Sequence, residues 1–595
     1  MVFRRLVRIT SSIYRNNVQF ISCSATIANP AVHMHALTGL PEDRIALIDK
    51  DSSPCGPRHH AIWNPPYKNE LYPLFGRIPA INETSRLACL LIKKGIRTII
   101  FCRVRRSCEL LLKQIHCDLE KEDHLRSRVM GYRGGYRPEE RRKIEKDMFQ
   151  GKLLAIVATN ALELGIDIGS LDAVLHMGFP FSMASYHQQC GRAGRRKMDS
   201  LSIMIADGDN QLDQHWMKRP RELFQSVAES VALDVNNELT LEGHLQCAAA
   251  ESPFDLETDA EYFPGTLESI KTLCQTHLLR GHDGVFYANH KYEGYPAKSI
   301  PIRGIEEEYY RVVDVSTNQD LEELETTRAM FTVYEGGIFL HQGKSYLVTE
   351  LNMDRRVAKV RPTNVEWTTF QRDFSDVDPI KTKESKAIAN SVCSALYGDV
   401  QATITVFGYH KINSKTKKII ESVEDLQMPP FIIQSSGFWV DIPSSTVDYI
   451  RAQGLNIEHG IHAASHALMS FMPIFVMATG MSDVRTECKN PHATRPRPAR
   501  IVIYDAKGKA GVAYSGYQQI SNLMSKAKDM VEACPCVEGC PECGISRSTC
   551  SEQNLAISKP ACLLLFHGIF GERWTTSSSS AILPSGETNQ LKATK

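Results

Sequence analysis

The stretch Leu153–Gly169, L-L-A-I-V-A-T-N-A-L-E-L-G-I-D-I-G, decides the fold of the chain. Its first seven residues form an apolar run with the length of a buried strand, and the glycines that follow indicate a loop after that strand. Similar runs predict strands at Arg97–Cys102, Ala173–Phe179 and Leu201–Ala206. Helices are expected between the strands, at Ser107–Asp118, Pro138–Gln150 and Ser182–Cys190. This alternation predicts an α/β domain whose parallel sheet is covered by helices on both faces.

The composition is that of a folded protein with several domains. The chain has 595 residues, of which 43% are apolar and 23% charged, which excludes a wholly disordered or fibrous protein. At roughly 150 residues per domain, the length predicts about three to five domains. No apolar run approaches the roughly 20 residues of a membrane-spanning helix, so no membrane partner is expected. Because 69 Lys and Arg nearly balance 68 Asp and Glu, a polyanion would have to bind a local basic patch.

Two arginines follow the deciding stretch in Y-H-Q-Q-C-G-R-A-G-R, Tyr186–Arg195. Arg192 and Arg195 share one face of a helical turn, and the glycines beside them let the backbone approach a ligand. A guanidinium fork matches the oxygens of a transferring γ-phosphoryl group, so both arginines are candidate arginine fingers. Asp167, which follows its strand, is a candidate to accept a ribose hydroxyl or to couple nucleotide to nucleic acid.

These stretches resemble the conserved motifs of superfamily 2 helicases. Q-x-x-G-R-x-G-R at Gln188–Arg195 is similar to motif VI, and Ala158–Asp167 is similar to motif V. Ser24-Ala25-Thr26 is similar to motif III, and Ile99–Leu111 is similar to motif IV. The motifs keep the order and spacing of that family. The alternative from the residues alone is a parallel α/β domain whose Arg192 and Arg195 form only surface ion pairs.

A narrower resemblance covers about Phe3–Lys559. Asp51–His59, Trp63–Pro66, His244–Pro253 and the C-terminal cysteines resemble the Hrq helicases of fungi and the MrfA helicases of bacteria. These are DEAD/DEAH-box-related, RecQ-like DNA helicases with a winged-helix domain and a C-terminal zinc domain. The resemblance implies an ATP-dependent 3′-to-5′ DNA translocase in DNA repair, nuclear in a eukaryote and otherwise cytoplasmic.

The resemblance also implies roles for individual residues. Gln188, Arg192 and Arg195 would act on ATP with Mg²⁺, while Gly165, Asp167 and Gly191 would contact the nucleotide. Ser24 and Thr26 would lie toward the nucleic acid. The implied partners are DNA, single-stranded or with a single-stranded tail, and repair proteins.

The chain departs from the family where the phosphate-binding loop is expected. It contains no G-x-x-x-x-G-K-[ST] and no Asp-Glu dipeptide for a D-E-x-H box. A near match at Gly337–Ser345 has the wrong spacing, and strand residues follow it, whereas a phosphate cradle requires a helix N-terminus. We therefore expect the sequence to begin inside a first RecA-like domain and to have no ATPase activity alone. A truncated gene model and a non-catalytic nucleic-acid-binding or regulatory protein are the alternatives.

The N-terminal residues have two further interpretations. Four arginines before residue 26 and no acid before Glu42 are typical of a mitochondrial transit peptide. The competing interpretation is a buried strand at Val18–Ser22 that ends in the Ser24-Ala25-Thr26 turn. A remnant of a RecA-like domain explains the basic composition without a transit peptide.

A basic segment predicts contact with a nucleic-acid strand. Between Arg86 and Gln150, 17 Lys or Arg face 9 Asp or Glu. Within it, Tyr132–Arg142 interleaves aromatic residues, glycines and arginines, which suits base stacking and close backbone approach. The candidate strand contacts are Arg133, Arg137 and Thr159. Arg141, Arg142 and Lys143 are expected on a solvated helical face, paired with neighbouring glutamates.

Cysteines near the C-terminus predict a zinc site. Cys534, Cys536, Cys540 and Cys543 have the spacing C-x-C-x3-C-x2-C, which can supply four thiolates to a tetrahedral Zn²⁺ ion. Cys550 is either a spare or a substitute for Cys534. A disulfide set is the alternative, disfavoured in reducing surroundings.

His462 and His466 lie four residues apart in I-H-A-A-S-H-A-L, on one face of an expected helix. The sequence lacks the glutamate of H-E-x-x-H, so a metalloprotease site is excluded. Buried, hydrogen-bonded histidines are expected.

Together these signals divide the chain into six segments. Residues 210–300 are mostly helical, the alternation at Tyr309–Phe370 predicts strands with a hairpin at Gln342-Gly343, and the polar stretch Gln371–Lys386 resembles a linker. The segments are a remnant of RecA-like domain 1 (1–66), RecA-like domain 2 (67–208), a winged-helix-like region (209–304), a β-rich domain with a linker (305–386), a zinc-binding domain (387–563) and a partly disordered tail (564–595).

Overall fold

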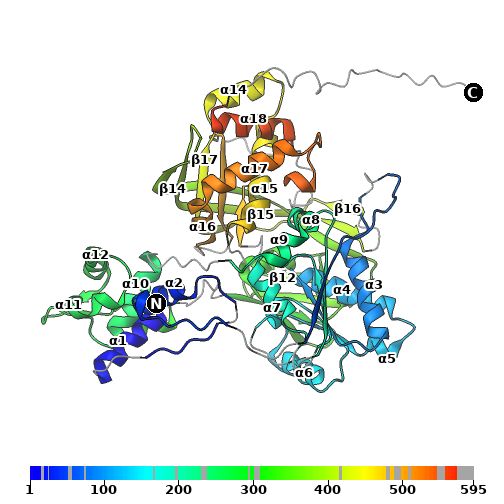
Figure 1. Ribbon diagram of the computed structural model, residues 1–595, viewed down its shortest axis with the longest axis horizontal. Helices are drawn as coiled ribbons and strands as arrows, with labels where there is room; N and C mark the ends of the chain where they lie inside the picture. The colour runs from blue at the N-terminus through cyan, green and yellow to red at the C-terminus, as the bar shows by residue number, and fades with distance from the viewer. Residues whose placement is uncertain are drawn as a thin grey trace, which may run out of the picture.

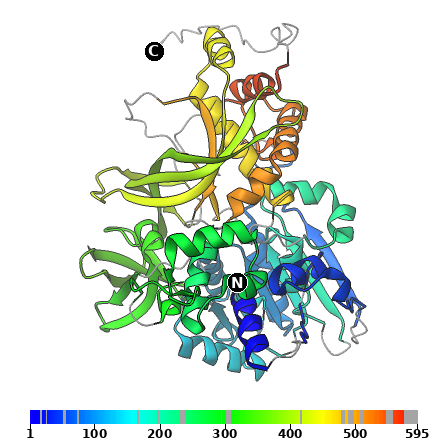
Figure 2. The same cartoon turned by 90° about the vertical axis from the view of Figure 1, so that its left-hand side faces the viewer.

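The computed structural model describes the chain apart from residues 15–18, 25, 51–55, 73–75, 165–167, 170, 195–197, 230–237, 293–294, 301–307, 415–417, 477–482, 488–496, 507–510, 546–556 and 573–595. Figure 1 shows a blue and cyan lobe around a central sheet, a lobe at the left where the N-terminal helices meet green helices, and a yellow to red lobe at the top. Figure 2 shows the top lobe seated across the lower two. Of the predicted tail (564–595), residues 564–570 are helical and residues 573–595 lie outside the described residues.

The central sheet has six parallel strands in the order β1-β6-β5-β2-β4-β3. The strands are β1 (Arg58–Trp63), β2 (Thr98–Cys102), β3 (Val129–Tyr132), β4 (Ala155–Ala158), β5 (Ala173–Met177) and β6 (Ser200–Ile205). The sheet confirms the predicted parallel α/β domain. Strand β3 has no counterpart among the predicted strands, because V-M-G-Y is a short run interrupted by a glycine.

Helices cover both faces of this sheet. Ile100 points toward α3 (Ala80–Lys93) and α4 (Arg105–Asp118), whereas Ile99 points toward α6 (Pro138–Phe149). Successive strand residues face opposite sides, so a strand buried on both faces must be apolar throughout. That requirement explains why T-I-I-F-C is buried at every position.

Strand β1 extends this sheet at one edge. It pairs with β6 from Arg58 to Trp63. The predicted boundary at residues 66/67 is therefore wrong, because part of the segment 1–66 belongs to the sheet of the second RecA-like domain.

The first two helices pack against the winged-helix region instead. Helix α1 (Val2–Tyr14) contacts α2 (Pro30–Thr38) and α10 (Glu238–Glu251). The Arg8 side chain is buried, and its guanidinium donates to the carbonyl of Ala248 at 2.8 Å and to Asp259 at 2.8 Å. The described part of the alternative strand, residues 19–22, is coil, and Ile21 is 95% exposed, so the buried-strand interpretation is wrong there.

The winged-helix region and the segment before it are mostly helical, as predicted. Their further elements are α8 (Gln211–Lys218), α9 (Pro220–Gln225), α11 (Leu256–Asp259), α12 (Leu267–His277), and the hairpin of β7 (Leu279–Arg280) with β8 (Phe286–Tyr287). An apolar cluster that includes Leu245, Phe254 and Ile270 joins the helices to the hairpin.

The β-rich domain is a five-stranded sheet in the order β10-β9-β13-β12-β11. Its elements are β9 (Tyr309–Asp314), β10 (Gln319–Glu325), α13 (Thr326–Thr332), β11 (Ile338–His341), β12 (Lys344–Asn352) and β13 (Val357–Thr363). The predicted hairpin at Gln342-Gly343 is confirmed, with φ values of 50° and 73° that suit a tight two-residue turn.

The second antiparallel sheet corrects the predicted linker. Strand β14 (Trp367–Ala387) pairs with β15 (Ser394–Asn413) along its whole length, so residues 371–386 are strand. Residues 380–385 of this strand are exposed to solvent, which explains their polarity, whereas the polar side chains of Arg372 and Asp373 are buried within the protein. The C-terminal domain therefore begins near Trp367 and not at residue 387.

Helices complete this C-terminal domain. The other strands are β16 (Ile419–Val423), β17 (Phe431–Asp441), β18 (Val484–Thr486) and β19 (Arg500–Asp505), and the helices are α14 (Ser444–Ala452), α15 (Ile457–Phe471), α16 (Val512–Gln518), α17 (Ile520–Ala533) and α18 (Lys559–Phe570). Their shared core includes Leu468, Leu523 and Leu565, each fully buried. Among the described residues, no helix is both long enough and apolar enough to cross a membrane.

Candidate nucleic-acid interface and metal centre

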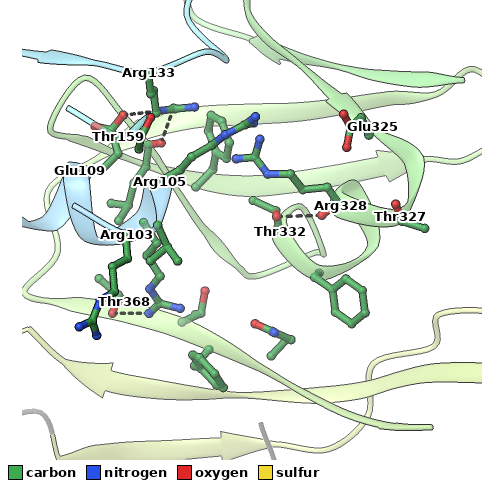
Figure 3. Close-up of a pocket in the computed structure, with 18 of the residues that line it drawn as sticks. Arg103, Arg105, Glu109, Arg133, Thr159, Glu325, Thr327, Arg328, Thr332 and Thr368 are labelled. Atoms are coloured by element: carbon green, nitrogen blue, oxygen red, sulfur yellow. Dashed lines mark hydrogen bonds and ion pairs between the residues drawn. The ribbon is translucent and has the colours of Figure 1, made fainter. Parts of the chain in front are cut away.

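A cleft of about 590 Å³ opens where the RecA-like, β-rich and C-terminal domains meet (Figure 3). Six arginines line it: Arg103, Arg105, Arg106, Arg133, Arg328 and Arg485. Three acids line it: Glu109, Glu325 and Asp483. This local excess of arginine suits a polyanion. The overall charge of +1 gives no sign of this local positive charge.

The parallel sheet positions the RecA-like side of this cleft. Arg103 follows β2 and Thr159 follows β4, two neighbouring strands of the sheet. Ligands of open α/β sheets bind beyond the carboxyl ends of the strands, so both residues lie where a site is expected. Thr159 is 4% exposed and precedes the 3₁₀ turn η3 (Asn160–Leu162), which places it in the cleft as a candidate strand contact.

The structure gives Arg133 a different role from the predicted strand contact. Its side chain is 2% exposed, and its Nε donates to Glu109 at 2.7 Å while its Nη1 donates to Glu322 at 2.6 Å. The backbone of Gly343 donates to the other oxygen of Glu109 at 2.6 Å, and Tyr136 donates to Glu109 at 2.8 Å. We call these five residues the ionic joint, because they fasten the β-rich domain to the RecA-like domain. The third nitrogen of Arg133, Nη2, donates to the carbonyl of Leu340 at 3.3 Å, so all three nitrogens bind within the protein. These contacts contradict the expectation that Arg133 binds the strand.

The other predicted residues of the basic segment lie outside the cleft. The Arg137 side chain is 48% exposed and lies 3.8 Å from Glu140. Arg142 and Lys143 are exposed on α6, as expected of a solvated face, and Arg141 is half-buried. Ser24 is exposed and Thr26 is half-buried in the coil before α2, and neither lines the cleft.

Sequence reasoning missed most of the cleft wall. Arg328 lies on α13, Thr368 and Phe370 lie on β14, and Arg485 lies on β18. The Arg106 guanidinium donates to Thr368 at 3.1 Å and lies 5.4 Å from the centre of the Phe370 ring. If Trp367–Ala387 had been recognised as a strand, Thr368 and Phe370 could have been predicted as part of this wall.

Arg103 is held by a buried carboxylate that no motif indicates. Asp213, on α8, is fully buried, forms an ion pair with Arg103, and accepts from the backbone of Phe179 at 2.9 Å. Burial raises the pKa of Asp213, while the charge of Arg103 and backbone donors lower it. Arg103 is therefore fixed at the floor of the cleft.

The motif VI residues lie on and after α7 (Met183–Cys190). The carboxylate of Glu229 accepts from the amides of Met183 and Ala184 at 2.6 and 3.1 Å, which satisfies the start of this helix. Gln188 Oε1 is buried without a hydrogen-bond partner among the described residues. Such an orphaned acceptor leaves a place for a donor from outside the described chain.

Arg192 is 7% exposed, and its Nε donates to the carbonyl of Glu163 at 3.1 Å. Gly191 ends α7. The other nucleotide candidates, Gly165, Asp167 and Arg195, lie outside the described residues.

The four predicted cysteines come together after α17, in the segment 534–544 that we call the zinc knuckle. The Sγ atoms of Cys534 and Cys540 lie 3.4 Å apart, and those of Cys536 and Cys543 lie 3.7 Å apart. All four sulfurs lie within 4.8 Å of one another. Sulfurs around a tetrahedral Zn²⁺ ion with Zn–S bonds of about 2.3 Å lie about 3.8 Å apart, so this donor set fits zinc.

A buried lysine supports the zinc knuckle from α18. Lys559 is 3% exposed, and its Nζ donates to the carbonyls of Cys534 and Cys536 at 2.6 and 2.7 Å. The same ammonium lies 3.4 Å from the Cys536 sulfur, where it offsets thiolate charge. Cys550, the predicted spare, lies outside the described residues.

The histidine pair on α15 is buried, as expected. The Nε2 atoms of His462 and His466 lie 2.8 Å apart, so one nitrogen donates and the other accepts. Within the described residues the only metal-ligating cluster of three or more groups is the zinc knuckle.

Family models match three parts of the chain. The helicase conserved C-terminal domain matches residues 82–197, the winged helix domain of ATP-dependent helicase HRQ1 matches 233–305, and the MrfA Zn-binding domain matches 464–544.

Related proteins extend this similarity to almost the whole chain. ATP-dependent helicase HRQ1 of Saccharomyces cerevisiae is 42% identical over 96% of this chain and 54% of its own length. The hrq1 helicase of Schizosaccharomyces pombe is 40% identical over 91% of this chain and 52% of its own length. The uncharacterized ATP-dependent helicase YprA of Bacillus subtilis is 34% identical, with 91% of this chain and 70% of that protein covered. The chain thus spans about half the length of its curated fungal relatives.

Solved structures of the DUF1998 helicase MrfA share the fold. MrfA bound to DNA has a TM-score of 0.73 and 31% identity, covering 95% of this chain and 73% of that one. MrfA bound to DNA and AMPPNP has a TM-score of 0.72 and the same identity, covering 95% and 72%.

Proposed function

The chain belongs to the HRQ1/MrfA family of helicases, and from this premise we propose that it is the C-terminal portion of an ATP-dependent 3′-to-5′ DNA helicase or translocase that acts in DNA repair. The observation that carries the proposal is the arginine-lined cleft beyond the carboxyl ends of β2 and β4. MrfA has been solved with DNA, which supports DNA as the polyanion here.

The cleft can hold a single strand by two kinds of contact. Arginine side chains neutralise phosphates and make charge-assisted hydrogen bonds to them. Phe331 and Phe370 both line the cleft, and Arg485 lies 4.4 Å from the centre of the Phe331 ring. Aromatic and arginine faces stack on bases of any sequence, so we expect binding with little sequence preference.

The motif VI residues would serve ATP. MrfA has also been solved with AMPPNP, an ATP analogue. ATP with Mg²⁺ would supply the phosphoryl group whose transfer drives movement. Gln188, with its orphaned buried oxygen, fits a partner from outside the described chain, and Gly191 follows directly after α7 as its cap. Arg192 would have to exchange the carbonyl of Glu163 for a phosphate oxygen, and Arg195 would join it as the second arginine finger.

The remaining parts of the proposal concern the metal and the location. Zn²⁺ bound by Cys534, Cys536, Cys540 and Cys543 would be structural, because all four positions of the tetrahedron are filled by thiolates. As in the family, we propose a nuclear location in a eukaryotic cell and repair proteins as partners. The second candidate is a non-catalytic DNA-binding or regulatory protein.

Salt-dependent binding tests the DNA-binding part of the proposal. The affinity of the 595-residue chain for a fluorescent oligothymidine should fall steeply with salt, with a slope of about −0.7 per phosphate contacted. Arg485→Ala should reduce the salt slope by about the value for one phosphate contact. Arg142→Ala, which removes an exposed arginine of α6, should leave the slope unchanged. Binding that ignores salt, or equal behaviour of both variants, would overturn the proposed interface.

ATP turnover separates the two candidate functions. We expect no DNA-stimulated ATPase activity from this chain alone, because the sequence lacks the P-loop that positions the phosphates. Turnover above a buffer blank that disappears in Arg192→Ala would contradict that expectation.

A further inference from the structure

Three arginines from two domains converge on one buried carboxylate. The Glu322 side chain is fully buried on β10 of the β-rich domain, and Arg133 binds both of its oxygens, at 2.6 and 2.7 Å. Arg105 of α4 and Arg328 of α13 lie 3.8 and 3.7 Å from Glu322 Oε1. These two longer contacts attract without forming hydrogen bonds, so Glu322 orients both guanidinium groups without using their donors.

Arg105 and Arg328 thus keep their donors for the cleft. Their side chains are 42% and 25% exposed, and neither guanidinium has a hydrogen-bond partner among the described residues. Figure 3 shows the two guanidinium groups next to each other, with Arg105 reaching in from the helicase domain and Arg328 from the opposite wall. Two like charges held close together, with free donors, form a binding site for an anion that both can contact.

Besides Glu322, which both guanidinium groups contact, one further acid opposes this pair. Glu325 is half-buried and also lines this part of the cleft. Glu325 reduces the local positive charge, so net charge alone would attract an anion only weakly. Arg105 and Arg328 therefore suit an anion whose oxygens accept hydrogen bonds in fixed directions. A phosphodiester has such oxygens and fits between two forks.

We propose that Arg105 and Arg328 bind one phosphate of the nucleic-acid strand together, and that Glu322 is the positioning residue that aims them. This rests on the proposed function and assigns a strand contact to the β-rich domain. We call Arg105 and Arg328 the clamp. Because the ionic joint fastens their two domains together, the β-rich domain and the second RecA-like domain would hold the strand as one body.

The shared phosphate gives a distinctive salt dependence. When the 595-residue chain binds fluorescent oligothymidine, Arg328→Ala and Arg105→Ala should each weaken the affinity about tenfold, because each removes one charge-assisted hydrogen-bonding group. The double variant should flatten the salt slope by about 0.7, the value for one phosphate, and not by about 1.4 for two. Arg361→Ala, which removes an exposed arginine of β13 outside the cleft lining, is the control for the loss of a positive charge.

Two glutamate variants test the positioning role. Glu325→Gln and Glu322→Gln each remove one negative charge near the cleft. Loss of the opposing Glu325 should tighten binding, whereas loss of Glu322 should weaken it because Arg105 and Arg328 are no longer aimed. Tighter binding by both variants would overturn the positioning role of Glu322. If Glu322→Gln fails to fold, the arginine variants decide.

Failure of the clamp and failure of the DNA interface are distinguishable. A parent chain that does not bind oligothymidine, or binds without salt dependence, contradicts the proposed function. The other outcome contradicts only the clamp. In it, the affinity of the parent chain falls steeply with salt, but Arg328→Ala has the same affinity and salt slope as Arg361→Ala.

Discussion

Two of the attachments between the C-terminal half of the chain and the second RecA-like domain with its adjoining helix α8 differ in what holds them. The ionic joint consists of side chains that the protein supplies in full, with Arg133 between Glu109 and Glu322. The zinc knuckle lies against α8, where Glu542 binds Lys218 at 2.7 Å, but its four sulfurs converge on a place for a metal ion. The first attachment should therefore fail when one charge is removed, and the second when the metal is removed.

Metal removal should have the largest effect. Chelation or Cys540→Ser should unfold the C-terminal domain around the zinc knuckle, because structural zinc contributes an apparent ~10 to 16 kcal/mol near neutral pH. Calorimetry should show that transition lost while the RecA-like transition stays cooperative. Elemental analysis should find about one zinc per chain, and Cys117→Ser, at an exposed free thiol, should change neither result. A metal-free protein with an unchanged melting profile would rule out the zinc assignment.

Breaking the ionic joint should have the next largest effect. Arg133→Ala leaves Glu109 buried without a cation and Glu322 with only its longer contacts to Arg105 and Arg328. Loss of one partner of a buried pair costs about 3 to 5 kcal/mol. Denaturant melts followed by intrinsic fluorescence should show this loss with zinc still bound. A loss below about 1 kcal/mol would mean that the joint does not hold the two domains together.

Lys559→Met should have a smaller effect, confined to the zinc knuckle. The substitution keeps the length of the side chain but removes the ammonium that binds the carbonyls of Cys534 and Cys536. Residues that support metal ligands typically change metal affinity about 10- to 100-fold. Competition with a chromophoric chelator should show a weaker zinc site, with the melting of the RecA-like domain unchanged. An unaltered zinc affinity would remove Lys559 from the site.

Arg137→Ala should have the smallest effect and serves as the counterpart of Arg133→Ala. The Arg137 side chain is 48% exposed, and its pairing with Glu140 at 3.8 Å should contribute less than about 0.5 kcal/mol. The affinity for single-stranded DNA should also change little, because Arg137 does not line the cleft. A large loss of DNA affinity in this variant would place the strand along α6 instead.

The parallel sheet and the zinc knuckle were predictable because their signals are local. A strand buried on both faces must be apolar throughout, and four cysteines within ten residues can reach one ion without help from distant residues. The fate of Arg133 was not predictable in this way. Its partner Glu322 lies 189 residues further along the chain, and the aromatic and glycine residues around Arg133 resemble a strand-binding loop.

The β14 strand shows the opposite error. Its polar residues suggested a linker, but the strand pairs with β15 along its length, and Arg372 and Asp373 are buried. Polarity alone does not identify a linker when a long antiparallel partner satisfies the backbone. The cleft wall at Thr368–Phe370 was missed for the same reason.

Photocross-linking of a single strand that carries 4-thiothymidine at each position in turn tests the location of the DNA most directly. If the cleft binds the strand, mass spectrometry of the full chain should place cross-links in the peptides that contain Phe331 and Phe370. Arg485→Ala should reduce these cross-links, and Arg142→Ala should not. Cross-links confined to α6 or to the winged-helix region, with none on either side of the cleft, would contradict the assignment of the cleft as the DNA interface.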